Sequence, residues 1–232
     1  MSFILDTMSI SKAPRSRLHA TPKPTPKITK ADRTRAAILD AALAFVWSHP
    51  FRDMTVNGLM EMTGITRSVF YRYFHDIHDL MKTLLDMLAD EIFSAVGPWL
   101  QGTGDPVSLM NETITGLVQV CYERGPFLRA VSDAARADKR FEKDWTQFME
   151  AFDEAGCARV KADQEQGLIP AFDPAPVVFA LNRLDAYTII DAFGQRPRRQ
   201  PEPVRVALAR IWISTLYGAE YFEQGASNLI RK

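Results

Sequence analysis

The chain of 232 residues lacks the features that mark several classes of protein. It has two cysteines, Cys121 and Cys157, which are too few and too far apart for a disulfide scaffold or a cysteine metal site. We expect them to be buried or idle thiols in a reducing cytoplasm. No apolar run approaches the length of a membrane span, and the order of the first residues is wrong for a secretory signal.

The signs of an enzyme are missing as well. There is no Gly-rich loop to cradle a phosphate, no His/Glu metal motif and no histidine after His78. General acid–base catalysis would then depend on isolated carboxylates. We therefore expect no enzymatic activity, no cofactor and no membrane partner.

The net charge of zero hides a modest asymmetry. Residues 1–80 carry 11 Lys/Arg against 7 Asp/Glu, whereas residues 81–232 carry 17 against 21. A basic N-terminal part joined to an acidic remainder is expected if only that part approaches phosphates.

The segment 55–74 reads as two short helices broken at Gly64. Apolar residues occupy one side of each: Val56, Leu59 and Met60 in the first, and Ile65, Val69, Phe70 and Phe74 in the second. The other side of the second helix carries hydroxyl and guanidinium groups without a carboxylate: Thr66, Arg67, Ser68, Tyr71, Arg72 and Tyr73. A helix-turn-helix needs this division, because its second helix enters the major groove and reads base edges from its first turn.

The first turn of the second helix would bring three residues to the base edges: Thr66, Arg67 and Ser68. Arg67 suits a two-bond contact with guanine, with a phosphate contact as the alternative. The hydroxyls of Tyr71 and Tyr73 suit phosphate oxygens, although Tyr73 alternatively packs beneath the helix. Thr55 would cap the first helix and offer its amide to a phosphate, and capping alone also explains it.

Three regions follow along the chain. Residues 1–28 hold four prolines among lysines and arginines, which predicts a flexible basic arm that lies along DNA or is only a disordered tail. Residues 29–75 are expected to form the three-helix DNA-binding module, starting with a capping box at Thr29 and Asp32. In residues 76–232 we expect further helices, from 76 towards Pro98 and near 105–123, 126–138, 140–166, 174–193 and 203–223. No window alternates as a strand does, so the predicted fold is all-α.

The module resembles the N-terminal signature of TetR-type transcriptional regulators in four places: Thr55-Val56, Gly64-Ile65-Thr66-Arg67, Phe70-Tyr71-Arg72-Tyr73-Phe74 and Leu80. The later part resembles the ethionamide-resistance repressors of mycobacteria within that family, in three short pieces: 145–149, 181–184 and 211–218.

The resemblance implies that residues 76–232 form a helical ligand-binding and dimerisation domain. It implies a homodimer built on the helices near 174–193 and 203–223, and a cavity coupled to the spacing of the two DNA-reading heads. The expected function is a cytoplasmic, ligand-responsive regulator of transcription, a repressor that a small lipophilic effector releases from a double-stranded DNA operator. The alternative is a ligand-independent DNA-binding or chromosome-organising protein of the same fold.

One departure from the family concerns the start of the fourth helix. The family usually has Ser-Lys there, and this chain has Asp76-Ile77, so the cap remains and the phosphate-binding lysine is lost. His75, His78, Arg72 or the arm would replace it. We expect His75 and His78 to face DNA or solvent, in preference to a metal.

In the body, the implied cavity would be lined by aromatic residues and methionine: Trp99, Trp145, Phe148, Met149, Phe152 and Trp212, with Phe179 and Tyr217 as further candidates. Core packing is the alternative for each. Asn182 and Asp185 lie three apart in an apolar helix, so they need partners, and a ligand is one candidate. The resemblance makes Asn182 a ligand contact, whereas Asp185 replaces a second asparagine and admits a cationic or amide-donating ligand. The alternative pairs Asp185 with Arg183 or Arg210 at the surface or dimer seam. Three arginines of a Pro-rich loop, Arg196, Arg198 and Arg199, are expected to be solvated.

Overall fold

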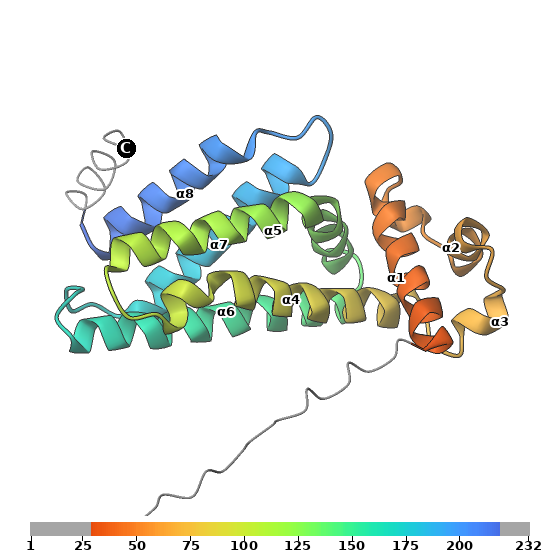
Figure 1. The fold of residues 1–232 in the computed structure, drawn as a ribbon, viewed down its shortest axis with the longest axis horizontal. Coiled ribbons are helices and arrows are strands. Elements are labelled where there is room, and N and C mark those ends of the chain that lie inside the picture. The colour runs from red at the N-terminus through yellow and green to blue at the C-terminus, as the bar shows by residue number, and fades with distance from the viewer. Residues whose placement is uncertain (1–28, 219–232) are drawn as a thin grey trace, which may run out of the picture.

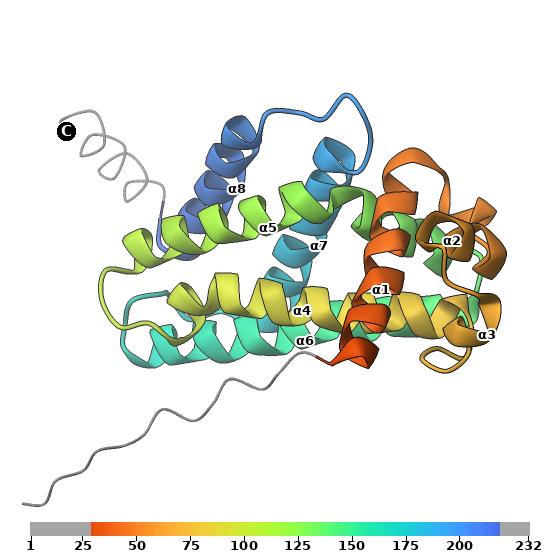
Figure 2. The ribbon, with the colours of Figure 1, turned by 45° about the vertical axis from the view of Figure 1, so that its right-hand side comes forward.

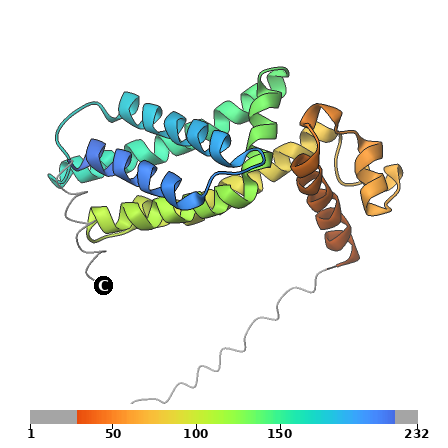
Figure 3. The same ribbon diagram turned by 90° about the horizontal axis from the view of Figure 1, so that it is seen from above.

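The computed structural model describes residues 29–218, and this part of the chain is helical without a strand, which confirms the predicted all-α fold. Figure 1 shows α1, α2 and α3 gathered at one end; we call them the head. Helices α4 to α8 form a larger bundle, the body. The start of α4 extends to the head, which is clearest in the view from above (Figure 3). Across residues 29–218, no helix combines the length and apolar character needed to cross a membrane.

The head consists of α1 (Lys30–Ser48), a short 3-10 turn (Phe51–Asp53), α2 (Val56–Thr63) and α3 (Arg67–Phe70). The predicted capping box is present, because Thr29 Oγ1 accepts the Asp32 amide at 3.1 Å while Asp32 Oδ2 accepts the Thr29 amide at 2.9 Å. The small core of the head is closed by side chains from all three helices: Ile38, Leu39, Ala42, Phe45, Leu59, Met60 and Phe70.

Helix α4 (Ile77–Gln101) begins at the Asp76 cap and buries leucines and isoleucine at four-residue spacing: Leu80, Leu84, Leu88 and Ile92. It continues through Pro98, although proline removes a helical hydrogen bond. Thr113, from the helix that follows, bonds to the backbone on both sides of the proline. Its hydroxyl oxygen accepts the Trp99 amide at 2.9 Å, and its hydroxyl donates to the Val96 carbonyl at 3.4 Å.

Helix α5 (Pro106–Ala135) corrects the expectation of two helices near 105–123 and 126–138, because it runs unbroken through Pro126. A proline at this position leaves the carbonyl of Tyr122, four residues earlier, without its helical donor. Arg198 supplies the missing donor from a distant loop, with Nη1 2.7 Å from the Tyr122 oxygen. The helix survives its proline because a side chain repairs the lost bond.

The remaining helices are α6 (Lys139–Glu165), α7 (Pro174–Phe193) and α8 (Pro201–Leu216). Their ends follow the proline and glycine signals closely, and α8 starts two residues before the predicted 203. Figure 2 shows α7 crossing the bundle from α6 to α5, with the loop between α7 and α8 at the head-facing end. The end of the predicted helix beyond 218 and the expected arm, residues 1–28, lie outside the described residues.

Candidate functional site

The turn between α2 and α3 sets the direction of the short α3. Thr55 caps α2 by accepting the Gly58 amide at 3.1 Å. Gly64 ends the helix in the left-handed region, with φ 66°, where a residue with a side chain is strained. Phe70 then anchors α3 in the core, because it is fully buried. Helix α3 is shorter than the sequence suggested, and residues 71–73 form a turn.

The outer side of α3 is exposed and polar, as the sequence predicted. The side chains of Thr66, Arg67, Ser68, Tyr71 and Arg72 face solvent, and Thr55 and His75 are also exposed. Tyr73 is half-buried against the core, so it follows the packing alternative in part. Arg67 Nη2 donates to the Tyr71 hydroxyl at 3.0 Å, and Thr66 Oγ1 lies 3.0 Å from Ser68 Oγ. These groups bond to one another in the absence of another partner.

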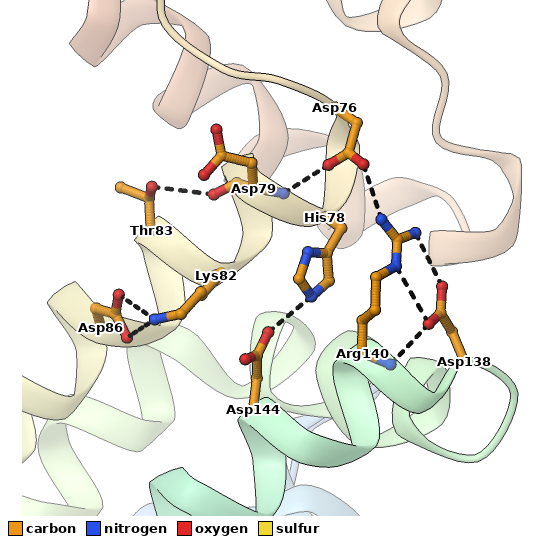
Figure 4. Close-up of polar contacts among 9 residues, drawn as sticks. All are labelled: Asp76, His78, Asp79, Lys82, Thr83, Asp86, Asp138, Arg140 and Asp144. Carbon is orange, nitrogen blue, oxygen red and sulfur yellow. Dashed lines mark hydrogen bonds and ion pairs between the residues drawn. The ribbon is translucent and has the colours of Figure 1, made fainter.

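The start of α4, directly after the head, is joined to α6 by a polar cluster, shown in Figure 4. The two oxygens of Asp76 have different tasks. Oδ1 accepts the Asp79 amide at 2.8 Å, and Oδ2 binds Arg140 Nη1 at 2.8 Å. Arg140 also binds Asp138, with Nη2 3.1 Å from Oδ2. Burial raises the pKa of Asp76, but the Asp79 amide and Arg140 outweigh it, so the pKa is lowered and the carboxylate stays charged. The residue that departs from the family pattern thus both caps α4 and holds α6.

His78 corrects the expectation that it faces DNA or solvent. Its Nε2 lies 2.7 Å from Asp144 Oδ2 of α6, and both side chains are largely buried. Phe141 covers the imidazole edge-on, with ring centres 4.8 Å apart, and contacts Phe51 of the head at 5.2 Å. Among the described residues there is no group of three ligands that would hold a metal ion. His78 therefore holds the start of α4 against α6, beside the contact that Phe141 makes with the head.

A second contact between head and body involves the loop after α7, whose three arginines we expect to be solvated. Arg196 and Arg199 are exposed as expected, whereas Arg198 is half-buried and corrects the expectation. The Arg198 guanidinium lies over two rings, 4.7 Å from Trp47 of α1 and 3.9 Å from Tyr122 of α5. Arg196 also lies over Trp47, at 5.3 Å. Each such cation–π contact contributes about 0.5–2 kcal/mol. The loop after α7 therefore holds the end of α1, and Arg199 pairs with Asp191 at 3.0 Å.

The body contains an apolar cavity of about 100 Å³ between α4, α5, α6, α7 and α8. The structure brings all eight residues of the sequence-based ligand site to its wall: Trp99, Trp145, Phe148, Met149, Phe152, Asn182, Asp185 and Trp212. Two further candidates lie elsewhere. Phe179 is half-exposed and its ring lies beneath the Arg183 guanidinium. Tyr217 is buried, and its hydroxyl donates to Asp163 Oδ2 at 2.7 Å. An occupied ligand site usually measures about 300–1,000 Å³, so the cavity must widen for a ligand of ordinary size.

Asp185 is 6% exposed and lies on the cavity wall. Its Oδ2 accepts the Trp212 indole N–H at 2.9 Å, while Oδ1 has no hydrogen-bond partner among residues 29–218. The alternative pairing with Arg183 is wrong, because Arg183 Nη1 binds Asp153 at 2.8 Å. Burial raises the pKa of Asp185 to about 7, against the lowering effect of the Trp212 bond. Asn182 finds its partner in the same Asp153, to which Nδ2 donates at 2.8 Å.

Several of these functional contacts had no visible signal in the sequence. Asp144, Arg140 and Asp153 are ordinary charged residues of an amphipathic helix, and nothing in their spacing shows what they face. Pro126 is a partial exception. A proline inside a helical pattern signals an unpaired carbonyl, but the donor that fills the gap lies 76 residues beyond that carbonyl.

Comparison with known proteins shows that the chain is similar to regulators of transcription. The family described as "Transcriptional regulator EthR, C-terminal domain" matches residues 110–218. The HTH-type transcriptional regulator EthR of Mycolicibacterium smegmatis is 26% identical over 217 residues, covering 92% of this chain and 97% of that protein. The nucleoid occlusion factor SlmA of Marinobacter nauticus is 29% identical over 140 residues, covering 59% and 71%.

Solved structures share the fold. A TetR-family regulator from Syntrophomonas wolfei superposes with a TM-score of 0.69 at 15% identity, covering 79% of this chain and 94% of that one. A transcriptional regulator from Saccharomonospora viridis, solved in complex with choline, gives 0.63 at 12% identity, with 79% and 97% covered. At these identities the likeness concerns the fold alone.

Proposed function

We propose that this chain, an EthR-like regulator of the TetR family, is a repressor that a small lipophilic effector releases from its operator. The observation that carries the proposal is the pairing of two surfaces in one chain. The exposed start of α3 has no carboxylate, and the body encloses an apolar cavity. Helix α4 connects them, because it follows α3 directly at the head and its second half lines the cavity with Ile92, Val96 and Trp99.

In this proposal the DNA contacts are those expected from the sequence: Thr55, Thr66, Arg67, Ser68, Tyr71, Arg72, Tyr73 and His75. The first turn of α3 reads bases, and the remaining groups hold phosphates. Each region has its own role in the proposal. The arm of residues 1–28 adds non-specific DNA affinity, the head module of residues 29–75 reads the operator sequence, and the body of residues 76–232 regulates binding. The partner is double-stranded DNA in the cytoplasm, and we propose no catalytic activity, in keeping with the regulator names of the relatives.

We further propose a homodimer built on α7 and α8. Apolar side chains are exposed along these helices in the single chain, most of all Tyr187 at 74% and Phe179 at 52%. Leu184 and Val206 extend the same apolar character. A two-fold dimer would present two heads to successive major grooves, about 34–36 Å apart. An effector that favours another spacing would release the DNA, by no more than its differential affinity for the two states.

The test is a gel shift with DNA from upstream of the protein's own gene, with and without lipophilic small molecules. Filling the cavity should act as a built-in effector. Ile114 is fully buried on α5 and lines the cavity, so Ile114→Trp should stay dimeric and bind operator about tenfold more weakly. Gly156 also lines the cavity but is unsuitable, since a Cβ there would lie 2.8 Å from Val178 Cγ1 and would push α6 from α7.

Ile213→Trp is the matched control, because Ile213 is equally buried on α8 but does not line the cavity. It shows the effect of overpacking alone, which costs about 1–3 kcal/mol of stability. If Ile114→Trp binds DNA as the wild type does and no compound releases it, the effector-controlled function is wrong. The second candidate, a ligand-independent DNA-binding protein, would then be favoured, and the match to a nucleoid occlusion factor supports keeping it.

Removing residues 1–28 should leave a folded dimer with lower DNA affinity and a shallower dependence of affinity on salt. The segment carries Lys12, Arg15, Arg17, Lys23 and Lys27, and each contact with a phosphate contributes about 0.9 to the slope of log affinity against log salt. Binding isotherms at several salt concentrations measure that slope. An unchanged slope would show that the arm does not contact DNA.

A further inference from the structure

We propose that the cavity selects a slender apolar ligand bearing one protonated amine, which binds the free oxygen of Asp185. The inference rests on the proposed function only in taking this cavity as the effector site. The binding itself is measured without DNA, so the two ideas fail separately.

The first step is the unsatisfied acceptor. Asp185 Oδ1 is buried and has no hydrogen-bond partner in the part of the chain that the structure describes, while Oδ2 accepts the indole N–H of Trp212 at 2.9 Å. A buried polar atom without a partner is rare and destabilising, and it calls for an explanation such as a missing ligand. Because the carboxylate borders an otherwise apolar cavity, a donor placed in that cavity is the natural partner.

The second step is that three of the N–H donors around the cavity, those of Trp99, Trp212 and Asn182, are already engaged. The indole N–H of Trp99 donates to the Tyr217 hydroxyl at 2.7 Å, and Trp212 donates to Asp185 itself. The amide nitrogen of Asn182 donates to Asp153 at 2.8 Å. A ligand with only hydrogen-bond acceptors would have to compete for these N–H groups. A ligand with a hydrogen-bond donor can bind the Asp185 oxygen directly.

The third step concerns charge. An ionised carboxylate in an apolar wall needs a compensating cation. Arg183, the nearest arginine on the same helix, is bound to Asp153. Around Asp185, α5 contributes the thiol of Cys121 and α8 the Trp212 indole, and α4 and α6 contribute apolar side chains. A ligand ammonium would therefore be the compensating charge, and it would hold Asp185 in the ionised form.

The size of the cavity limits the ligand. An engineered cavity of about 150 Å³ accepts a benzene molecule, and this one measures about 100 Å³. A slender alkyl chain fits such a space with less rearrangement than a ring system. We therefore choose n-hexylamine as the probe and 1-hexanol as its neutral partner of equal heavy-atom number.

The experiment measures the affinity of both probes for the full-length protein, by calorimetry and by the fluorescence of the tryptophans that line the cavity. At pH 8 wild-type protein should bind hexylamine at least about tenfold more tightly than hexanol. Lowering the pH to 5.5 protonates Asp185, whose pKa is about 7, and should reduce hexylamine affinity by about tenfold or more. The alkylammonium itself stays charged at both pH values.

Asp185→Asn should abolish the preference for hexylamine and its pH dependence. Asp191→Asn is the matched control, since it removes a carboxylate from the solvent-facing side of the same helix, and it should keep both. A preference for hexanol, equal affinities, no binding, or a preference retained in Asp185→Asn would each overturn the proposal. If Asp185→Asn does not fold, the pH dependence of the wild type decides. Should hexylamine bind as expected without releasing operator DNA, the ligand class stands and the effector role fails.

Discussion

Replacing Arg67 by alanine should weaken binding to the operator by about 10- to 100-fold while leaving the fold intact. A two-bond contact between arginine and guanine contributes about 1–3 kcal/mol of discrimination, and Arg67 is exposed in the first turn of α3, where base edges are within reach. The variant should also bind variant operators with less discrimination at one base pair. Competition binding against operators substituted at each position measures both effects.

Tyr71→Phe separates base recognition by Arg67 from the phosphate contact of the Tyr71 hydroxyl. The Tyr71 hydroxyl accepts from Arg67 Nη2 at 3.0 Å in the free protein, so removing it frees Arg67 without changing its charge. Loss of a phosphate contact should weaken all DNA sequences alike. Lys161→Ala is the charge control, because this lysine is exposed in the last turns of α6, which ends at Glu165. Wild-type affinity and base preference in Arg67→Ala would show that the reading surface lies elsewhere.

Asp185→Asn should gain stability relative to the wild type as the pH rises from 5 to 8. The pKa of Asp185 is raised to about 7 by burial, above the ordinary value of 3.8. Between pH 3.8 and about pH 7, the folded wild type therefore keeps a proton on Asp185 that the unfolded chain has released. The stabilisation that protonated Asp185 gives the folded wild type is fully present below the pKa of Asp185 in the unfolded chain. It is lost as the pH rises through about 7, the pKa in the folded protein. The difference in unfolding free energy between variant and wild type should grow by about 2–3 kcal/mol.

Chemical denaturation at four or five pH values provides the measurement. Because every other titrating group is common to both proteins, their contributions cancel in the difference. Asp191→Asn reports the effect of removing a surface charge from the same helix. A difference that stays constant between pH 5 and pH 8 would contradict the raised pKa and would indicate that Asp185 ionises normally in its pocket.

Local rules account for most of the helices but not for those that contain proline. The ends of α7 follow directly from Asp173-Pro174 and Gly194, because caps and helix-starting prolines act on neighbouring residues. The same reasoning failed at Pro126. Whether a proline ends a helix depends on what replaces its hydrogen bond, and here the replacement comes from Arg198, whose approach is a property of the whole fold.

The candidate site shows the same limit. Periodicity placed Arg67 on an exposed face and Phe70 beneath it, because a helix at the surface has one buried apolar face and one exposed polar face. It also indicated that Asp185 lies in an apolar helix. It did not reveal that Oδ2 accepts the Trp212 indole N–H, or that Oδ1 has no hydrogen-bond partner among the described residues. Both depend on where α8 crosses α7. His78 was misplaced for a similar reason, as its partner Asp144 is remote in sequence.

The head meets the body over several elements, since α1 and the 3-10 turn both pack against α5. Phe51 also packs on Phe141 of α6, and Trp47 packs against Arg198 of the loop that follows α7. Helices α6 and α7 both line the cavity, so a small slide between them would displace these two contacts by different amounts. The head would then tilt relative to the body.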